Sequence, residues 1–464
     1  MPKPRHSAKS KGQRSWSSNS AAQAAPLPGI AAYDGADNEE NDGDRIDVDG
    51  GVLEGGGQIL RSSMAYAAIR RVPIRVRDIR KNREKPGLRP QHMTGVSLVA
   101  GISNSRVAGV RVDSRELTFT PQTSGSSAGT TSTAAPFSQP STNYTPELFS
   151  ATETVSRTYA CDTGTAGSVA LLIQASLPVL LLQPGRTRLT LRGGTDVDHA
   201  PPIDYVTKVF QPVVHQKIGL NHASGNENVS FEVGLQRRGL YPRGGGEVVL
   251  DVRGVDQGRG WPGFELVDPG EVVKVIGYLW SSPGTPDSVL DEMETAARRV
   301  LRKNITFQQS EPAMTEEDGP TDRITFERTS HARDSCVGGI GAGLLLVAHT
   351  TTHCLLASSS HYSPSKRDPF SPARAGLRAS NAATSLADQI RTGTCVDEYL
   401  QDQLIILMAL AKGESRMRCG ELTLHTQTGI YVAERMLPGV TFTVTEVDGR
   451  RGVWDVWCSG SPPI

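Results

Sequence analysis

His425 is the side chain best placed for covalent chemistry. It is one of ten histidines, and it follows the strand-like stretch 422–424 where the chain runs into a new helix. A neutral imidazole is a competent nucleophile toward a phosphoryl group, and its ordinary pKa of about 6.5 leaves it mostly unprotonated at neutral pH. Position alone favours a structural histidine, so a catalytic role depends on the partners around it.

A cationic loop at residues 75–92 could bind phosphate. Two prolines and a glycine stiffen its centre, KPGLRPQH at residues 85–92, which reduces the entropy lost when arginine side chains close on phosphate oxygens. The alternative is a solvated cationic surface loop. The cations of this segment are Arg75, Arg77, Arg80, Lys81, Arg83, Lys85 and Arg89.

A glycine run, EGGGQ at residues 54–58, follows a short strand expected at residues 46–49 and opens an expected helix. Its backbone amides could cradle phosphate, and Glu54 could hold a divalent cation. Glycine runs before helices are often ordinary turns, so by itself this run is weak evidence for a phosphate site.

Three further motifs have a functional and an ordinary structural interpretation. GGTD at residues 193–196 with HAPP at 199–202 offers a rigid proline face that could stack against a base, or simply a helix entry. RGLYPRGGGE at residues 238–247 is better explained as a tight loop before a strand. Tyr399, Asp402 and Gln403 share one helical turn, and a nucleotide-binding role for them gains weight only together with His425.

A repeated pattern of helix, strand and helix must position these residues. Apolar residues recur at helical spacing, then form strand-like stretches, then return to helical spacing, in three copies. Such units imply a repeated α/β fold in which polar residues at the strand ends converge near one cleft. The elements are expected at residues 58–69, 73–79 and 91–102, at 168–182, 187–191 and 203–214, and at 398–411, 421–424 and 429–436.

A stretch of different character, residues 256–393, separates the second copy from the third. We expect a smaller inserted α+β domain there, and a catalytic domain made of residues 44–255 plus 394–464. The inserted elements are expected as strands at 272–280, 341–348 and 354–357 and as helices at 287–303 and 381–391.

Low-complexity segments are excluded from the expected fold. Residues 1–43 are basic and then acidic, with too few apolar residues to offset the entropy of ordering, so we expect a disordered tail. The Ser/Thr/Gly-rich stretch 121–152 and the Ser/Pro-rich stretch 358–374 are interpreted as surface insertions.

Composition restricts the class of protein. Lys+Arg and Asp+Glu both number 49, so any attraction for phosphate must come from local clusters. The longest apolar run, at residues 169–182, is interrupted by polar residues and a proline. We therefore expect no transmembrane segment and no membrane partner.

The cysteines and the first residues bear on location. The six cysteines have no regular spacing, which favours a reducing, intracellular compartment. The basic first thirty residues could be a nuclear or RNA-tethering tail or a mitochondrial presequence. The nucleus is the expected location, and the cytoplasm is the alternative.

Taken together, these motifs resemble the successive signatures of the RNA 3′-terminal phosphate cyclases. Their order and approximate spacing match across about residues 45–460. Five motifs in sequence are far more specific than any one of them. They are DG at 49–50 with EGGGQILR at 54–61, KPGLRPQH at 85–92, GGTD at 193–196 with APP at 200–202, YPRGGGE at 241–247 and DEYLQDQ at 397–403.

The resemblance implies a large domain of repeated helix–strand units similar to the C-terminal domain of translation initiation factor 3, with a smaller inserted thioredoxin-like α+β domain. It implies that His425, in LHTQT at 424–428, becomes adenylylated, and that Glu54 helps to bind a metal ion. The implied adenosine contacts are Gln174, Pro201, Tyr399, Asp402 and Gln403. The implied phosphate and RNA-end residues are Arg61, Arg80, Arg83, Gln91 and His92, to which the cationic loop adds Arg89.

The implied activity is the ATP-dependent conversion of an RNA 3′-phosphate into a 2′,3′-cyclic phosphodiester, with Mg²⁺ or Mn²⁺ and a histidine–AMP intermediate. The implied partner is therefore RNA with a 3′-phosphate end. One alternative is the non-catalytic, cyclase-like branch that serves in ribosome assembly, although that branch lacks the histidine and the GGGQ signature present here. A more distant alternative is an enolpyruvyl transferase-like enzyme, whose substrate requires no nucleophile at His425.

Overall fold

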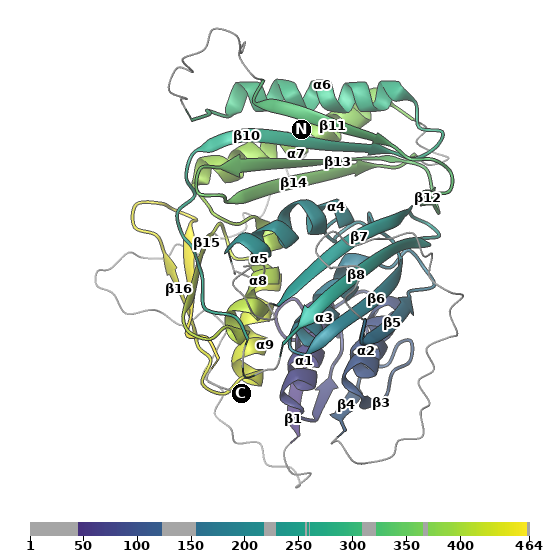
Figure 1. Ribbon diagram of the computed structural model, residues 1–464, viewed down its shortest axis with the longest axis vertical. Helices are drawn as coiled ribbons and strands as arrows, with labels where there is room; N and C mark the ends of the chain where they lie inside the picture. Colours follow the sequence, from purple (N-terminus) through teal and green to yellow (C-terminus); the bar gives the residue numbers. More distant parts are fainter. Residues whose placement is uncertain are drawn as a thin grey trace, which may run out of the picture.

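The computed structural model describes residues 45–122, 155–217, 229–255, 258, 260–308, 322–364 and 370–461. The tail predicted at 1–43 and most of the insertion predicted at 121–152 lie outside these residues. Within them the chain is a mixed α/β structure, in which helices pack against four sheets (Figure 1). No described helix combines the length and apolar character needed to cross a membrane.

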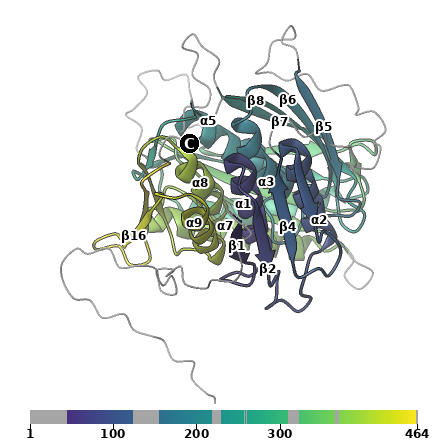
Figure 2. The ribbon, with the colours of Figure 1, turned by 90° about the horizontal axis from the view of Figure 1, so that it is seen from below.

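A layer of buried helices forms the centre of the larger part of the molecule. α1 (Gly57–Arg70) packs against α2 (Pro90–Ser103), α3 (Val169–Leu181) and α9 (Leu424–Met436), and α9 also packs against α8 (Glu398–Leu410). Figure 2 shows α1 between α9 and α2. α1 is buried on nearly every side because its residues are mostly apolar or small, which is typical of a helix surrounded by other elements.

Three sheets surround this layer, with strand orders β1-β2-β4-β3, β12-β7-β8-β6-β5 and β16-β17-β15-β9. A short helical connection of α4 (Ile203–Tyr205), the π-helical turn η1 (Val206–Phe210) and α5 (Gln211–Lys217) links β6 to β7. The strands are β1 (Ile46–Asp49), β2 (Ile74–Arg77), β3 (Ser105–Ala108), β4 (Leu117–Pro121), β5 (Arg157–Asp162), β6 (Gly185–Gly193), β7 (Ser230–Gly239), β8 (Gly246–Gly254), β9 (Glu265–Leu266), β12 (Cys336–Val337), β15 (Ser415–Cys419), β16 (Phe442–Glu446) and β17 (Trp454–Cys458).

The fourth sheet belongs to the stretch between the second and third repeats. Its order is β11-β10-β13-β14, and α6 and α7 pack against each other and against this sheet (Figure 1). β10 is parallel to β11 and antiparallel to β13. The bounds are β10 (Val272–Ser281), α6 (Asp287–Asn304), β11 (Ile324–Ser330), β13 (Ala342–Thr350), β14 (Leu355–Tyr362) and α7 (Pro372–Thr392).

β13 lies between two hydrophobic cores. Leu344 and Leu346 belong to the core under α6 and α7, whereas Leu345 and Val347 belong to the core of the central helices. Successive side chains of a strand point to opposite faces, so a strand between two cores needs apolar residues at every position. This explains the continuous apolar run, and it shows that the fourth sheet packs onto the larger part of the molecule. The division into domains at residues 255 and 394 stays a prediction.

Most predicted elements are present, and three expectations were wrong. Residues 421–424 are not a strand, because the strand of the third repeat is β15 and ends at Cys419. The stretch 358–374 is not one loop, because β14 continues to Tyr362 through its ladder with β13. α7 begins at Pro372 rather than near residue 381, since the Ser371 side chain accepts a hydrogen bond from the Arg374 amide and caps the helix.

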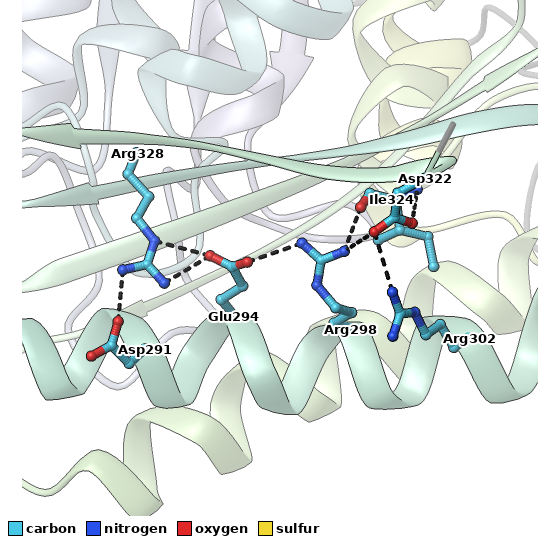
Figure 3. Close-up of polar contacts among 7 residues, drawn as sticks. All are labelled: Asp291, Glu294, Arg298, Arg302, Asp322, Ile324 and Arg328. Atoms are coloured by element: carbon cyan, nitrogen blue, oxygen red, sulfur yellow. Dashed lines mark hydrogen bonds and ion pairs between the residues drawn. The ribbon is translucent and has the colours of Figure 1, made fainter. Parts of the chain in front are cut away.

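An ion-pair network fastens α6 over the edge strand β11 (Figure 3). Arg328 on β11 binds Asp291 and Glu294 on α6, at 2.7 and 2.8 Å. Arg298 binds Glu294 at 2.9 Å and also Asp322, the residue that precedes the strand. Single exposed ion pairs contribute little, but shared partners reduce the side-chain entropy lost for each contact. The network therefore holds a strand whose side chains are largely exposed.

Asp397 joins the inserted stretch to the central helices. Its Oδ1 accepts hydrogen bonds from the amides of Tyr399 and Leu400, at 3.0 and 2.8 Å, and so caps α8. The same oxygen accepts from the Tyr205 hydroxyl at 2.6 Å, and Oδ2 accepts from the Ala357 amide on β14 at 3.0 Å. The carboxyl is 2% exposed, and burial raises its pKa to about 6.

We predict that Asp397→Ala lowers the free energy of unfolding by about 3 kcal/mol, because buried donors lose their shared acceptor. Urea denaturation followed by circular dichroism measures this change. The matched control is Asp388→Ala on the exposed face of α7, which removes an ion pair to Arg391 and should cost less than about 1 kcal/mol. Equal unfolding midpoints for the two variants would contradict the role of Asp397.

Candidate active site

His425 is the second residue of α9. The prediction that His425 lies at the end of a strand was wrong, because residues 421–423 form an irregular connection before the helix. Thr423 caps the helix, since its hydroxyl accepts a hydrogen bond from the Thr426 amide at 3.1 Å. The Gln401 Oε1 atom on α8 accepts from the Thr426 hydroxyl at 2.8 Å and from the Thr423 amide at 3.2 Å. α8 therefore fixes the turn that presents His425 toward solvent.

The glycine run lies against this same helical turn. The Glu54 amide donates a hydrogen bond to Thr428 Oγ1 at 3.4 Å, and the Thr428 hydroxyl donates to Leu424 O at 2.6 Å. The N-termini of α1 and α9 thus lie together, which places the positive ends of two helix dipoles near the imidazole. Such helix ends favour negative charge, so the arrangement suits an anionic ligand.

The surroundings of His425 keep its imidazole neutral. Partial desolvation of the ring lowers its pKa most, Glu54 opposes this effect, and Arg61 and Arg83 lower the pKa further. A pKa below the ordinary value of about 6.5 leaves the imidazole unprotonated at neutral pH. The ring can therefore act as a nucleophile without first losing a proton.

Glu54 has the features of a metal ligand. Its side chain is 8% exposed and forms an ion pair with Arg83 through Oε1. Its Oε2 atom is buried and makes no hydrogen bond within the described residues. A Cβ at Gly56 would come within 1.8 Å of Glu54 Oε1, so a larger residue there would displace this carboxylate. A carboxylate oxygen without a hydrogen-bond partner fits the preference of Mg²⁺ and Mn²⁺ for oxygen ligands.

Arg61 and His92 lie beside the glycine run. Gln58 Oε1 accepts a hydrogen bond from Arg61 Nη2 at 2.5 Å, while Arg61 Nε is buried with no partner among the described residues. A Cβ at Gly57 would lie 2.9 Å from Arg61 Nη1 and 3.1 Å from His92 Nε2, so both side chains reach this backbone. Burial lowers the pKa of His92 to about 3, and Arg80, Arg61 and Arg89 add to the effect. His92 is thus neutral and surrounded by cations.

Arg80 and Arg89 use part of their hydrogen-bonding capacity to shape the cationic loop. Arg80 Nη1 donates to Lys85 O at 2.9 Å and to Gly87 O at 3.1 Å. Arg89 Nη2 donates to Pro86 O at 3.1 Å, and Arg89 Nη1 pairs with Asp113 at 2.7 Å. The two guanidinium groups are therefore held in place before any ligand binds, which reduces the entropy that binding would cost.

The last of the predicted phosphate-site residues, Gln91, has a structural contact. Its Oε1 accepts a hydrogen bond from the Ser168 amide at 3.3 Å, at the start of α3. It lines a small cavity with Arg61, His92 and Gly57. The structure thus brings together Glu54, Arg61, Arg80, Arg83, Arg89, Gln91, His92 and His425.

Four of the five predicted adenosine contacts are divided between two cavities. Gln174, Asp402 and Gln403 line a cavity of about 30 Å³ together with Arg61. Gln174 Oε1 is buried and has no hydrogen-bond partner in the described part of the chain. Burial raises the pKa of Asp402 to about 7, and nearby Arg61 opposes this rise. These polar groups could bind the edge of a base.

Tyr399 lines a separate, larger cavity of about 410 Å³. Pro201 is buried, whereas its neighbours Ala200 and Pro202 line this larger cavity. The opposite wall comes from β14 and α7, with Ser358, Ser359, Ser360, His361 and Arg378.

The residues of this wall were not predicted from the sequence, because the stretch 358–374 was interpreted as a loop. The pairing of β14 with the apolar strand β13 was the signal that could have revealed it, since alternate serines then face one side.

Comparisons with known proteins identify the family. The family model of RNA 3′-terminal phosphate cyclases matches residues 52–444. The chain belongs to the RNA 3′-terminal phosphate cyclase family. An RNA 3′-terminal phosphate cyclase from Drosophila melanogaster is 34% identical over 415 residues, which cover 89% of this chain and 96% of that protein. One from Ignicoccus hospitalis is 34% identical over 393 residues, or 85% of this chain and 93% of that protein.

The family membership predicted from the motifs is therefore confirmed, and it covers both the central helices and the fourth sheet. The likeness of the two parts to an initiation factor domain and to thioredoxin stays a prediction, as do the roles of the individual cyclase-family residues.

We predict that His425 titrates below pH 6.5, that Arg83→Gln raises its pKa, and that Glu54→Gln lowers it further. Arg83 disfavours the imidazolium and Glu54 favours it, so removing each charge moves the pKa in opposite directions. NMR of the ring Cε1–Hε1 signals measures the titration, with His425→Gln identifying the signal. A pKa of 6.5 or above, or shifts of the same sign in both variants, would refute this electrostatic description.

Proposed function

We propose that this protein is a catalytically active RNA 3′-terminal phosphate cyclase that uses ATP to form a 2′,3′-cyclic phosphodiester through a histidine–AMP intermediate. The observation that supports it most is the neutral His425 at the N-terminus of α9, beside Glu54, Arg61 and Arg83. A nucleophile, two cations and a carboxylate around one helix end match the needs of nucleotidyl transfer.

In the first step, a nitrogen of His425 attacks the α-phosphorus of ATP. An N–P bond forms, the bond from phosphorus to the bridging oxygen breaks, and pyrophosphate leaves. Arg61 and Arg83 neutralise the charge that develops on the phosphate oxygens, and the helix N-termini orient them. A divalent cation bound at Glu54 would add a second source of charge neutralisation.

In the second step, an oxygen of the RNA 3′-phosphate attacks the phosphorus of the AMP. The N–P bond breaks, His425 is regenerated, and the RNA carries an activated diphosphate. In the third step, the vicinal 2′-hydroxyl attacks the RNA phosphorus, loses its proton and displaces AMP. The cationic loop at residues 75–92 would hold the RNA phosphate in line, so the contribution of the protein is mainly positioning and charge.

The non-catalytic branch of the family remains the main alternative. Two observations favour an active enzyme over a binding protein: the pKa of His425 is lowered, and an oxygen of Glu54 has no hydrogen-bond partner in the described residues. Neither feature is needed for binding a partner protein. An enolpyruvyl transferase-like reaction would give no covalent nucleotide, so the same labelling experiment tests both alternatives.

We predict that His425→Ala abolishes self-labelling from α-³²P-ATP with Mg²⁺ and reduces cyclisation by a thousandfold or more, on the order expected for loss of a nucleophile. The label should be acid-labile, and the melting curve should be unchanged. His353→Ala in the exposed turn after β13 is the matched control. Absence of label on the wild-type protein, or retained activity in His425→Ala, would rule out the mechanism.

We predict that Arg89→Ala weakens RNA-end binding more than self-adenylylation, whereas Arg83→Ala weakens both. Arg83 affects the pKa of His425 directly, but the charge of Arg89 acts on His92 instead. The measurements are KM for a 3′-phosphorylated oligonucleotide and the single-turnover rate of self-labelling. Equal losses in both quantities for Arg89→Ala would contradict its assignment to the RNA end.

A further inference from the structure

The loop between β3 and β4, residues 109–116, is attached along its length to the cationic loop. The Ile79 amide donates to Arg115 O at 2.9 Å, and the Leu88 amide donates to Ser114 O at 2.9 Å. In the other direction, the Asp113 amide donates a hydrogen bond to Leu88 O at 3.0 Å. The two loops therefore form one continuous surface, although the sequence separates them by α2 and β3.

The approach of the two loops is too close for side chains at the contact. Gly87 has a φ of +82°, and a Cβ there would lie 2.3 Å from Asp113 O. Only glycine accepts both this backbone conformation and this distance. The position of residues 109–116 relative to the proposed phosphate site is thus fixed by the fold.

The acids of this loop are already paired, and its arginines are not. Asp113 pairs with Arg89 at 2.7 Å, and Glu116 pairs with Arg75 at 2.8 Å. Arg111 and Arg115 are exposed and make no ion pair or side-chain hydrogen bond with any residue that the structure describes. The loop therefore presents uncompensated positive charge directly beside the proposed phosphate site.

An exposed apolar side chain lies between these cations. Val112 follows Arg111 in the chain, and 50% of its surface is exposed, so it is accessible to a ligand. Alternation of cations with an apolar side chain suits a nucleic-acid strand, which offers phosphates and the flat faces of bases. An acidic peptide would use the cations but would gain less from Val112.

We propose that Arg111, Val112 and Arg115 bind the single-stranded RNA upstream of its terminal phosphate. This inference rests on the proposed function. An RNA whose 3′-phosphate lies on the cationic loop at residues 75–92 must continue away from it, and residues 109–116 form the surface contiguous with that loop. Arg111 and Arg115 contact phosphates without reading sequence, and Val112 packs against a base. This subsite would make the enzyme prefer longer RNA ends to short ones.

The test is direct binding of 3′-phosphorylated oligonucleotides to the full chain, measured by fluorescence anisotropy in the absence of ATP. For Arg111→Gln/Arg115→Gln, the affinity for a 12-nucleotide RNA should fall about tenfold at low salt. The slope of log Kd against log salt should decrease by about 1.4, since each phosphate contact on a single strand contributes about 0.7. The affinity for a dinucleotide should change by less than about twofold.

The matched control is Arg299→Gln/Lys303→Gln, which removes the same two positive charges from the exposed face of α6 at the opposite end of the molecule (Figure 1). Equal affinities and slopes for the control and for Arg111→Gln/Arg115→Gln would overturn the proposal. So would equal losses for the 12-nucleotide RNA and a poly-glutamate peptide, which would indicate a general anion surface. Self-labelling of the wild-type protein tests the proposed function separately, because its failure leaves these binding measurements interpretable.

Discussion

The contact between the glycine run and the first turn of α9 is the constraint on which the candidate site depends. It joins the Glu54 amide to Thr428, residues 374 positions apart, and it brings the N-termini of α1 and α9 together. Each helix is held by its neighbours in the central layer, so the contact forms only in the folded chain. The chemistry proposed for His425 therefore requires the whole helix layer, since neither motif could attract a nucleotide phosphate alone.

The same arrangement brings several cations close together around His92. Burial and neighbouring cations lower the pKa of Arg80 and of His92, which shows that like charges crowd this region. Such repulsion destabilises the protein, and a bound anion would relieve it. Hydrogen bonds from Arg80 and Arg89 to loop carbonyls keep the cations in place despite this repulsion. The cations that would favour binding of an anion therefore lower the stability of the protein at this loop.

Periodicity and glycine placement predicted the central elements, because α1 and β1 follow local rules of spacing and termination. The family membership followed from motifs that are short and contiguous. What the sequence did not reveal depends on pairing between distant segments. β14 is a strand because β13 lies beside it, and Arg111 lies near the cationic loop because backbone bonds join the two loops. Likewise, the division of the predicted adenosine contacts between two cavities depends on how β14 and α7 pack.

Asp397 connects the fourth sheet to the central helices. Its carboxylate caps α8 and also accepts a hydrogen bond from the Ala357 amide on β14. Tilting of the fourth sheet against the central helices would therefore pull on the first turn of α8, where Tyr399 borders the larger cavity. Asp397 therefore links the sheet to this cavity wall, in addition to the buried contacts that Leu345 and Val347 make with the central core. A molecule bound between β14 and Tyr399 would restrict movement of β14 against α8. Loss of the Asp397 hydrogen bonds would make both elements more mobile.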